Sequence, residues 1–125
     1  MPLNIYYLDD EADLCENFVD YFATKDVHVT TFTDPKIAIH AIRIKPPDLL
    51  FVDYRLPGTT GDEVANALDA SFPIFLITGD ISAKTEYRFV QVFTKPFEES
   101  AITKIISEYI FEKNADRNIL KFGAA

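Results

Sequence analysis

Strand-like and helix-like stretches alternate along this chain. Short runs of apolar, β-branched and aromatic residues are typical of buried strands, and each is followed by a stretch in which apolar residues recur every three or four positions. The predicted strands are 5–8, 27–32, 49–52, 72–77 and 89–93, and the predicted helices are 12–25, 35–45, 62–70 and 98–113. Repeated strand–helix units predict an α/β fold, a parallel sheet with helices on both faces.

Each predicted helix has an apolar stripe that is expected to face the sheet. Asp34 followed by Pro35 is typical of a helix start, with an N-cap side chain before proline at the first helical position. The expected inward residues are Cys15, Phe18, Val19 and Phe22; Ile37, Ala38, Ala41 and Ile42; Val64, Ala65 and Leu68; and Ile102, Ile105, Ile106, Tyr109 and Ile110.

Composition narrows the class of protein. A chain of 125 residues with 48% hydrophobic residues is long enough for one domain with a real core, predicted here as 1–113 with a C-terminal tail at 114–125. A formal charge of -8 argues against binding nucleic acid, which basic surfaces recognise. A single cysteine, Cys15, and the lack of a signal-like start or a membrane-length apolar run lead us to expect a cytoplasmic protein without a membrane partner.

The ends of the predicted strands carry the candidate chemistry. Asp9 and Asp10 follow the first strand, Asp53 the third, Thr78 the fourth and Lys95 the fifth. Because the carboxyl ends of parallel strands meet at one edge of a sheet, these groups are expected to lie together. Three clustered carboxylates repel one another, and a hard divalent cation such as Mg²⁺ would relieve that repulsion.

A carboxylate beside such a metal is suited to attack phosphorus and form an acyl phosphate. In this interpretation Asp53 is the nucleophile, Asp9 and Asp10 hold the metal, and Thr78 and Lys95 bind phosphoryl oxygens. Each residue alone also has an ordinary explanation, as an N-cap, a turn residue or the start of a helix. Their joint occurrence, each at a strand end, is what favours a site.

Four motifs together carry a family resemblance. They are Tyr7-Leu8-Asp9-Asp10-Glu11; Val52-Asp53-Tyr54-Arg55-Leu56-Pro57 with Gly61; Leu76-Ile77-Thr78-Gly79; and Thr94-Lys95-Pro96-Phe97. Over about residues 3 to 113 the chain resembles the response-regulator receiver domains of two-component signalling. The resemblance implies a flavodoxin-like, doubly wound sheet of five parallel strands in the order 2-1-3-4-5.

The resemblance also assigns roles. It implies that Asp53 is the phosphoacceptor, that Asp9, Asp10, Asp53 and the Arg55 backbone carbonyl bind Mg²⁺, that Thr78 is the switch hydroxyl, and that Gly79 gives the phosphate access. Lys95 is the family's ammonium, and a cis peptide bond is expected before Pro96. The implied partners are a sensor histidine kinase or a histidine phosphotransfer protein, and a second copy of the chain in a homodimer. The implied reaction is self-catalysed transfer to Asp53 and its hydrolysis, rather than conventional turnover.

The chain departs from the family between Thr78 and Lys95. Only 17 positions separate these residues, and residues 82–88 have no apolar stripe, so the family's fourth helix is predicted to be short or absent. Val92 occupies the place of the family's switch aromatic; Phe93 would face the other side of the sheet, and Tyr87 or Phe89 is a candidate replacement. These departures predict normal phosphorylation with an atypical output.

Other interpretations remain at this stage. A pseudo-receiver that only binds other proteins would explain the altered output region, although the complete acidic set disfavours it. A metal-dependent phosphatase with an aspartyl nucleophile is disfavoured because Arg55 stands where such enzymes generally carry a second carboxylate. The C-terminal tail is either frayed or a docking segment that uses Ile119, Leu120 and Phe122. The chain itself is either a single-domain regulator or part of a longer one.

Overall fold

The computed structural model describes residues 1–80 and 82–123, with side chains described up to residue 115. Its centre is a parallel five-stranded sheet of β1 (Leu3–Leu8), β2 (Val27–Phe32), β3 (Leu49–Val52), β6 (Ile74–Thr78) and β7 (Val92–Thr94). The strands lie in the order β2-β1-β3-β6-β7 and pair in parallel throughout. The predicted α/β class and the strand order 2-1-3-4-5 are therefore confirmed.

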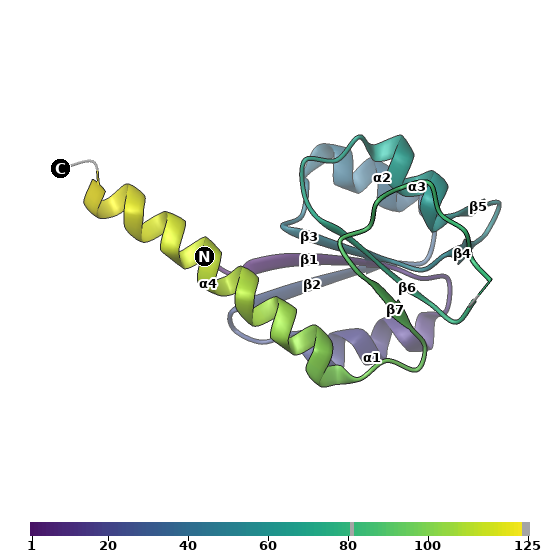
Figure 1. The fold of residues 1–125 in the computed structure, drawn as a ribbon, viewed down its shortest axis with the longest axis horizontal. Coiled ribbons are helices and arrows are strands. Elements are labelled where there is room, and N and C mark those ends of the chain that lie inside the picture. The colour runs from purple at the N-terminus through teal and green to yellow at the C-terminus, as the bar shows by residue number, and fades with distance from the viewer. Residues whose placement is uncertain (81, 124–125) are drawn as a thin grey trace.

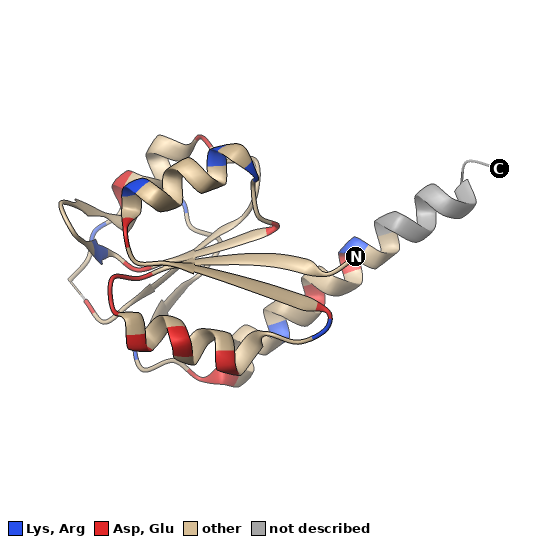
Figure 2. Cartoon of the chain, turned by 180° about the vertical axis from the view of Figure 1, so that it is seen from behind, with Lys and Arg blue, Asp and Glu red and all other residues tan. Residues whose placement is uncertain are grey.

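Helices cover both faces of the sheet (Figure 1). α1 (Ala12–Phe22) and α4 (Glu99–Gly123) pack on one face, and α2 (Pro35–Ile44) and α3 (Gly61–Leu68) pack on the other. A two-stranded hairpin of β4 (Arg55–Leu56) and β5 (Thr59–Thr60) lies between β3 and α3. The outward face of α1 carries a row of acidic residues, visible from behind in Figure 2: Asp13, Glu16 and Asp20.

Two apolar layers follow directly from the alternation of side chains along β1. Leu3, Ile5 and Tyr7 face α1 and α4, whereas Tyr6 and Leu8 face α2 and α3. The central strand β3 is buried along its whole length, so it contributes to both layers. An aromatic group forms the middle of the first layer: Tyr7, Phe18, Phe51 and Phe75, whose rings lie in consecutive contact.

The predicted helix faces are confirmed with one exception. Asp34 caps α2 as expected, because its carboxylate accepts a hydrogen bond from the Lys36 backbone amide at 2.9 Å. The prediction that Ile37 is buried was wrong, since this side chain is 60% exposed. It lies in the first turn of α2, whose buried residues are Pro35, Ala38 and Ile42.

The chain between β6 and β7 forms no helix within residues 82–91. The prediction that the family's fourth helix is short or absent is consistent with this segment, which we call the β6–β7 connection. Tyr87 and Phe89 pack against the α2/α3 layer with their rings edge to face at 4.9 Å. Asp62, in the first turn of α3, fixes the same segment through its Oδ1, which accepts hydrogen bonds from the amides of Glu86 at 2.9 Å and Tyr87 at 2.8 Å.

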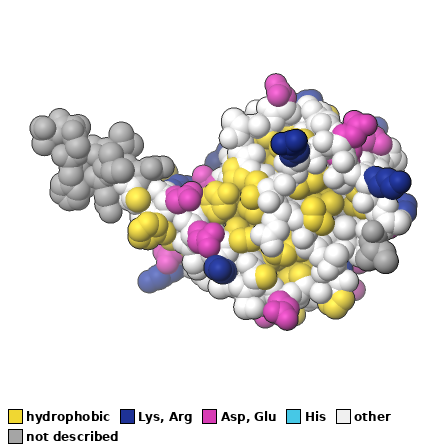
Figure 3. Space-filling model, in the orientation of Figure 1, with side chains coloured by type: hydrophobic (Ala, Val, Ile, Leu, Met, Phe, Trp, Pro, Cys, Tyr) yellow, Lys and Arg dark blue, Asp and Glu magenta, His cyan; other side chains and the backbone are white. Residues whose placement is uncertain are grey.

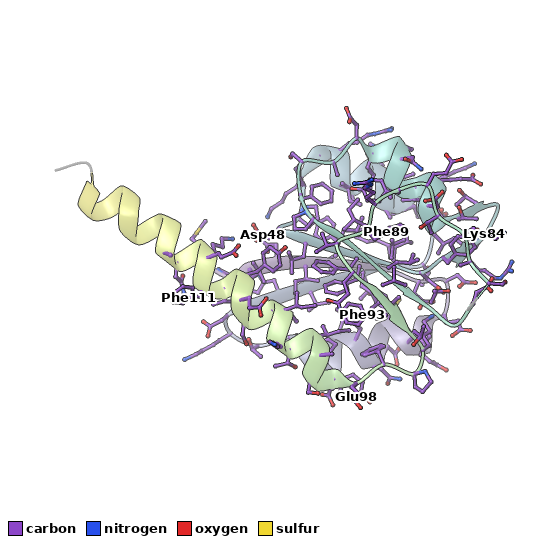
Figure 4. All side chains as sticks on the ribbon, in the orientation of Figure 1. Asp48, Lys84, Phe89, Phe93, Glu98 and Phe111 are labelled. Atoms are coloured by element: carbon purple, nitrogen blue, oxygen red, sulfur yellow. The ribbon has the colours of Figure 1, made fainter. Side chains whose placement is uncertain are left out.

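The edge of the sheet at β7 is open where a covering helix would lie. Val90 and Val92 are 58% and 51% exposed, and apolar side chains are visible across the face between α3 and α4 (Figure 3). Phe93 points instead into the α1/α4 layer, away from Phe89 (Figure 4). The predicted alternation of Val92 and Phe93 is therefore confirmed.

Lys113 links helix α4 to the start of the sheet through an ion pair and a hydrogen bond. The ammonium of Lys113 lies 2.8 Å from Oδ2 of Asp48 and donates to the Pro2 carbonyl at 3.0 Å, while the same Asp48 oxygen accepts from the Asn4 amide at 2.7 Å. The predicted helix at 98–113 corresponds to α4, which begins one residue later, at Glu99, and whose backbone continues to Gly123. The side chains of Ile119, Leu120 and Phe122 lie outside the described residues. Among the residues described, no helix has the length and apolar character needed to cross a membrane.

Candidate functional site

The strand-end residues meet at one edge of the sheet. Asp9 and Asp10 follow β1, Asp53 follows β3, and each of the three offers a carboxylate oxygen within 4.8 Å of the others. The parallel register accounts for this meeting, because Leu8 pairs with Val52 and the two strands therefore end at the same level. Asp9 and Asp53 are buried, and Asp10 is exposed.

Lys95 connects two of these carboxylates. Its Nζ lies 2.9 Å from Asp9 Oδ2 and 3.1 Å from Asp53 Oδ2. Burial disfavours the charged ammonium, but the hydrogen bond to Asp9 and the charges of Asp9 and Asp53 outweigh this effect and raise the pKa of Lys95 above its ordinary value. Lys95 therefore stays protonated and available to a negatively charged group at this edge.

Asp9 is fully buried and held by three donors. Its Oδ1 accepts a hydrogen bond from the Glu11 amide at 2.9 Å, and its Oδ2 accepts from Lys95 and, at 2.5 Å, from the Tyr7 hydroxyl. Burial, and then the hydrogen bond to Asp9, raises the pKa of Tyr7 well above its ordinary value, so the phenol remains a donor. The conformation of Asp9 is thus fixed by groups from the strand, the following turn and β7.

Asp53 is nearly buried and is held by contacts to both of its carboxylate oxygens. It is 8% exposed, and its Oδ1 accepts from the Tyr54 amide at 2.7 Å while its Oδ2 faces Lys95. Burial raises the pKa of Asp53 above its ordinary value, and the charge and hydrogen bond of Lys95 only partly offset that rise. The folded protein without metal therefore favours the neutral form of Asp53 more than water does.

Gly61 supports Asp53 from behind. A Cβ at this position would lie 2.3 Å from the Asp53 carbonyl oxygen, and the Gly61 amide donates to the Tyr54 carbonyl at 2.7 Å. Only glycine permits this close approach, since no other residue lacks a Cβ. The start of α3 and the backbone that carries Asp53 therefore lie in direct contact.

The site opens into a cavity of about 550 Å³. Asp10, Asp53, Thr78 and Lys95 line it together with Glu11, Arg55, Gly79 and Asp80, while Asp9 lies beneath them. The donor set suits a divalent cation: three carboxyl groups converge at the sheet edge beside a single ammonium, and hard oxygen donors are the ligands that Mg²⁺ prefers.

Thr78 and an ion pair border this cavity on the β6 side. Thr78 is 3% exposed, and its Oγ1 accepts from the Asp80 amide at 3.0 Å. The Arg55 guanidinium lies 2.6 Å from Asp80 Oδ2. Hydrogen bonds from Ser82, assisted by Arg55, lower the pKa of Asp80, so this carboxylate remains ionised beside the cavity.

The structure brings together every residue that the sequence singled out. Asp9, Asp10, Asp53, Thr78 and Lys95 all reach the same edge, and the cis peptide bond expected before Pro96 is present. Arg55 lies beside them with its side chain directed to Asp80. The sequence reasoning did not identify Tyr7, because its position in an apolar strand suggested only a core residue; the period of two that places Tyr7 and Asp9 on one face was the available signal.

Comparison with known proteins gives the family. The model of the response regulator receiver domain matches residues 5–107. The chain is 32% identical over 88 residues to the DNA-binding response regulator MtrA of Mycobacterium tuberculosis and of Mycobacterium leprae, which covers 69% of this chain and 37% of those proteins. The chain thus spans well under half the length of these curated relatives. It belongs to the response regulator receiver domain family.

Solved structures agree on the fold. A putative response regulator from Chloroflexus aurantiacus is 24% identical with a TM-score of 0.77, covering 88% of this chain and 98% of that one. A CheY-like receiver domain from Methylobacillus flagellatus is 17% identical with a TM-score of 0.76, covering 87% and 99%. At these identities the likeness supports the receiver fold alone.

Proposed function

We propose that this chain is a phosphoacceptor receiver domain that takes a phosphoryl group onto Asp53 in a Mg²⁺-dependent reaction. The observation that carries the proposal is the arrangement around Asp53: carboxylate oxygens of Asp9 and Asp10 within 4.8 Å, and the Lys95 ammonium at 3.1 Å, at the edge of an open cavity. The donor is a phosphohistidine of a sensor histidine kinase or a histidine phosphotransfer protein, and the setting is the cytoplasm.

In the transfer an oxygen of Asp53 forms a bond to phosphorus while the phosphorus–nitrogen bond of the phosphohistidine breaks, and the departing imidazole nitrogen takes up a proton. Lys95 and the Thr78 hydroxyl stabilise the charge on the phosphoryl oxygens. Asp9, Asp10, Asp53 and the Arg55 carbonyl would hold Mg²⁺, which supplies charge neutralisation for the carboxylates and the phosphoryl group. The protein contributes mainly position and electrostatics, as phosphoryl transfer requires.

The test is incorporation of phosphate from a small acyl phosphate donor, followed by intact-protein mass spectrometry. Wild-type protein with Mg²⁺ should gain one phosphoryl group, and this gain should disappear on chelation of the metal or in Asp53→Asn. Asp69→Asn is the matched control, because this exposed aspartate has a left-handed backbone (φ 47) that asparagine also tolerates. Equal labelling of Asp53→Asn would mean that another residue is the acceptor.

A protein-binding module without phosphorylation is the second candidate, favoured by the β6–β7 connection alone. Such a module has no need of the metal, so the absence of any Mg²⁺ response in amide NMR spectra would support it over the phosphoacceptor.

We further propose that the output of the phosphorylated chain is atypical. The supporting observations are the lack of a helix within residues 82–91 and the exposure of Val92 where the family carries its switch aromatic. A two-state switch needs contacts that differ between its states. With Mg²⁺ and beryllofluoride, amide shifts should concentrate around Asp53, Thr78 and the start of α3. Shifts that extend along β7 and α4 as in an ordinary receiver would contradict this proposal.

A further inference from the structure

Tyr7 stands apart from the other core aromatics because its hydroxyl reaches the acidic site. Tyr7 and Asp9 lie two residues apart and therefore point to the same face at the end of β1. The Tyr7 hydroxyl donates to Asp9 Oδ2 at 2.5 Å. The ring is 1% exposed and stacks on Phe18, with the ring centroids 4.4 Å apart and the planes 21° from parallel. The hydroxyl is thus held at a fixed point beside Asp9.

The neighbouring tyrosine shows that this contact is specific to one residue. Tyr6 lies on the opposite face of β1, and its hydroxyl donates to the carbonyl of Lys45, the C-cap residue of α2, at 3.0 Å. Both tyrosines are largely buried and both hydroxyls have one protein partner. They differ in that only Tyr7 contacts a member of the carboxylate cluster.

The hydrogen-bond donors to Asp9 have different roles in the proposed reaction. Lys95 is shared between Asp9 and Asp53, and it is the group expected to bind the incoming phosphoryl oxygens. When Lys95 engages the phosphoryl group, its hold on Asp9 weakens. The Glu11 amide on Oδ1 and the Tyr7 hydroxyl on Oδ2 then remain, one on each oxygen. A carboxylate has about four lone-pair positions, so these donors leave acceptor capacity for a cation.

We infer that Tyr7 is a positioning residue for the metal site: it holds Asp9 in the orientation that the cation requires, independently of Lys95. This inference rests on the proposed function. Hydrogen bonds to metal-ligating carboxylates fix the ligand before the ion arrives, and losing such a partner typically costs about 10 to 100-fold in metal affinity. Among the residues that the structure describes, Lys95 is the side-chain donor to Asp9 that remains in Tyr7→Phe, and the proposed reaction shares Lys95 with Asp53 and the phosphoryl group.

The experiment compares Tyr7→Phe with Tyr6→Phe, the matched loss of one buried hydroxyl from the same strand. Mg²⁺ is titrated into each folded protein and followed by amide NMR, and thermal melting without metal is measured in parallel. Tyr7→Phe should bind Mg²⁺ about 10-fold more weakly than wild type, whereas Tyr6→Phe should bind as wild type does. Phosphorylation of Tyr7→Phe should need more Mg²⁺ but reach the wild-type rate at saturation, the signature of lost positioning rather than lost chemistry.

Three outcomes would decide against the inference or its basis. Unchanged or tighter Mg²⁺ binding by Tyr7→Phe, with wild type binding normally, would overturn the inference and leave the proposed function intact. Equal weakening in both variants would show a general effect of lost stability and would also overturn it. A wild-type chain that binds no Mg²⁺ would overturn both the proposed function and this inference.

Discussion

Gly61 offers the sharpest test of how the site is built, because one methyl group can be added against the backbone of the phosphoacceptor. In Gly61→Ala the new Cβ would lie 2.3 Å from the Asp53 carbonyl oxygen and 3.2 Å from Cδ1 of Leu76. Real Cβ atoms are essentially never closer than 3.0 Å to such atoms, so the start of α3 and the Asp53 backbone must separate by at least about 0.7 Å.

The expected cost follows from that displacement. Overpacking of this kind typically costs about 1 to 3 kcal/mol, and the better helix propensity of alanine returns at most about 1 kcal/mol. A net loss of about 2 kcal/mol corresponds to a fall in melting temperature of roughly 8 °C for a domain of this size. Because the moving part carries Asp53, the rate of acyl-phosphate formation should also fall, by up to about 100-fold for a shift approaching 1 Å.

The assay is thermal unfolding of Gly61→Ala beside Gly79→Ala. A Cβ at Gly79 meets only the Lys95 Cβ at 3.9 Å, an ordinary contact, so this variant controls for the loss of glycine's chain flexibility. Gly79→Ala should melt at or slightly above the wild-type temperature. If Gly61→Ala melts as Gly79→Ala does, the close approach of α3 to Asp53 does not exist in the protein.

Three further predictions concern charge and anchoring. Since burial raises the folded pKa of Asp53, its contribution to stability is complete below the ordinary aspartate pKa and is lost as the pH rises through the folded pKa. Asp53→Asn should therefore melt above wild type at pH 7 without Mg²⁺, and the gap should close on acidification; a wild type that is the more stable at neutral pH would refute this. Lys113→Met keeps the apolar stem of the side chain but removes the ammonium from Asp48. The free energy of unfolding should fall by about 1 kcal/mol in low salt and by less in high salt. A loss of stability that does not depend on salt would point to packing instead. Asp62→Ala leaves two backbone amides of the β6–β7 connection without their acceptor. The free energy of unfolding should fall by about 1 to 3 kcal/mol, and those amides should exchange faster in hydrogen-exchange NMR. Unchanged exchange would show that Asp62 does not hold the segment.

The fold was predictable because it depends on periodicity. The five strands and the two helix layers follow from apolar runs and helical stripes, and burial at β3 matches its continuous hydrophobic sequence. The strand order came instead from the resemblance to the receiver family, and the sheet confirms it. Boundaries were less accurate: the last strand is Val92–Thr94 rather than 89–93, because residues 89–91 belong to the β6–β7 connection. Ile37 was misplaced since a helical period tells which residues share a face but not how far that face extends over the sheet.

The meeting of the site residues was also predictable, because parallel strands bring their carboxyl ends together. The hydrogen bonds and ion pairs that surround the site residues could not be predicted from the sequence. The hydrogen bond from Tyr7 to Asp9 depends on the exact rotamer of a core aromatic. The ion pair between Arg55 and Asp80 joins the β4–β5 hairpin to the loop after β6. Asp62 is an ordinary helix-start residue in the sequence, and its partners lie 24 and 25 positions away. Such pairs depend on how elements pack, which no local pattern contains.

The β6–β7 connection shows what a sheet needs when one of its covering helices is missing. A helix satisfies its own backbone amides and hides apolar strand surface at the same time. In this chain different side chains perform these two functions. The Asp62 carboxylate accepts hydrogen bonds from two of the amides, and the rings of Tyr87 and Phe89 cover part of the α2/α3 layer. Val92 in the edge strand and Val90 just before it remain exposed. One carboxylate and two aromatic rings thus do for this part of the sheet some of what a covering helix would do.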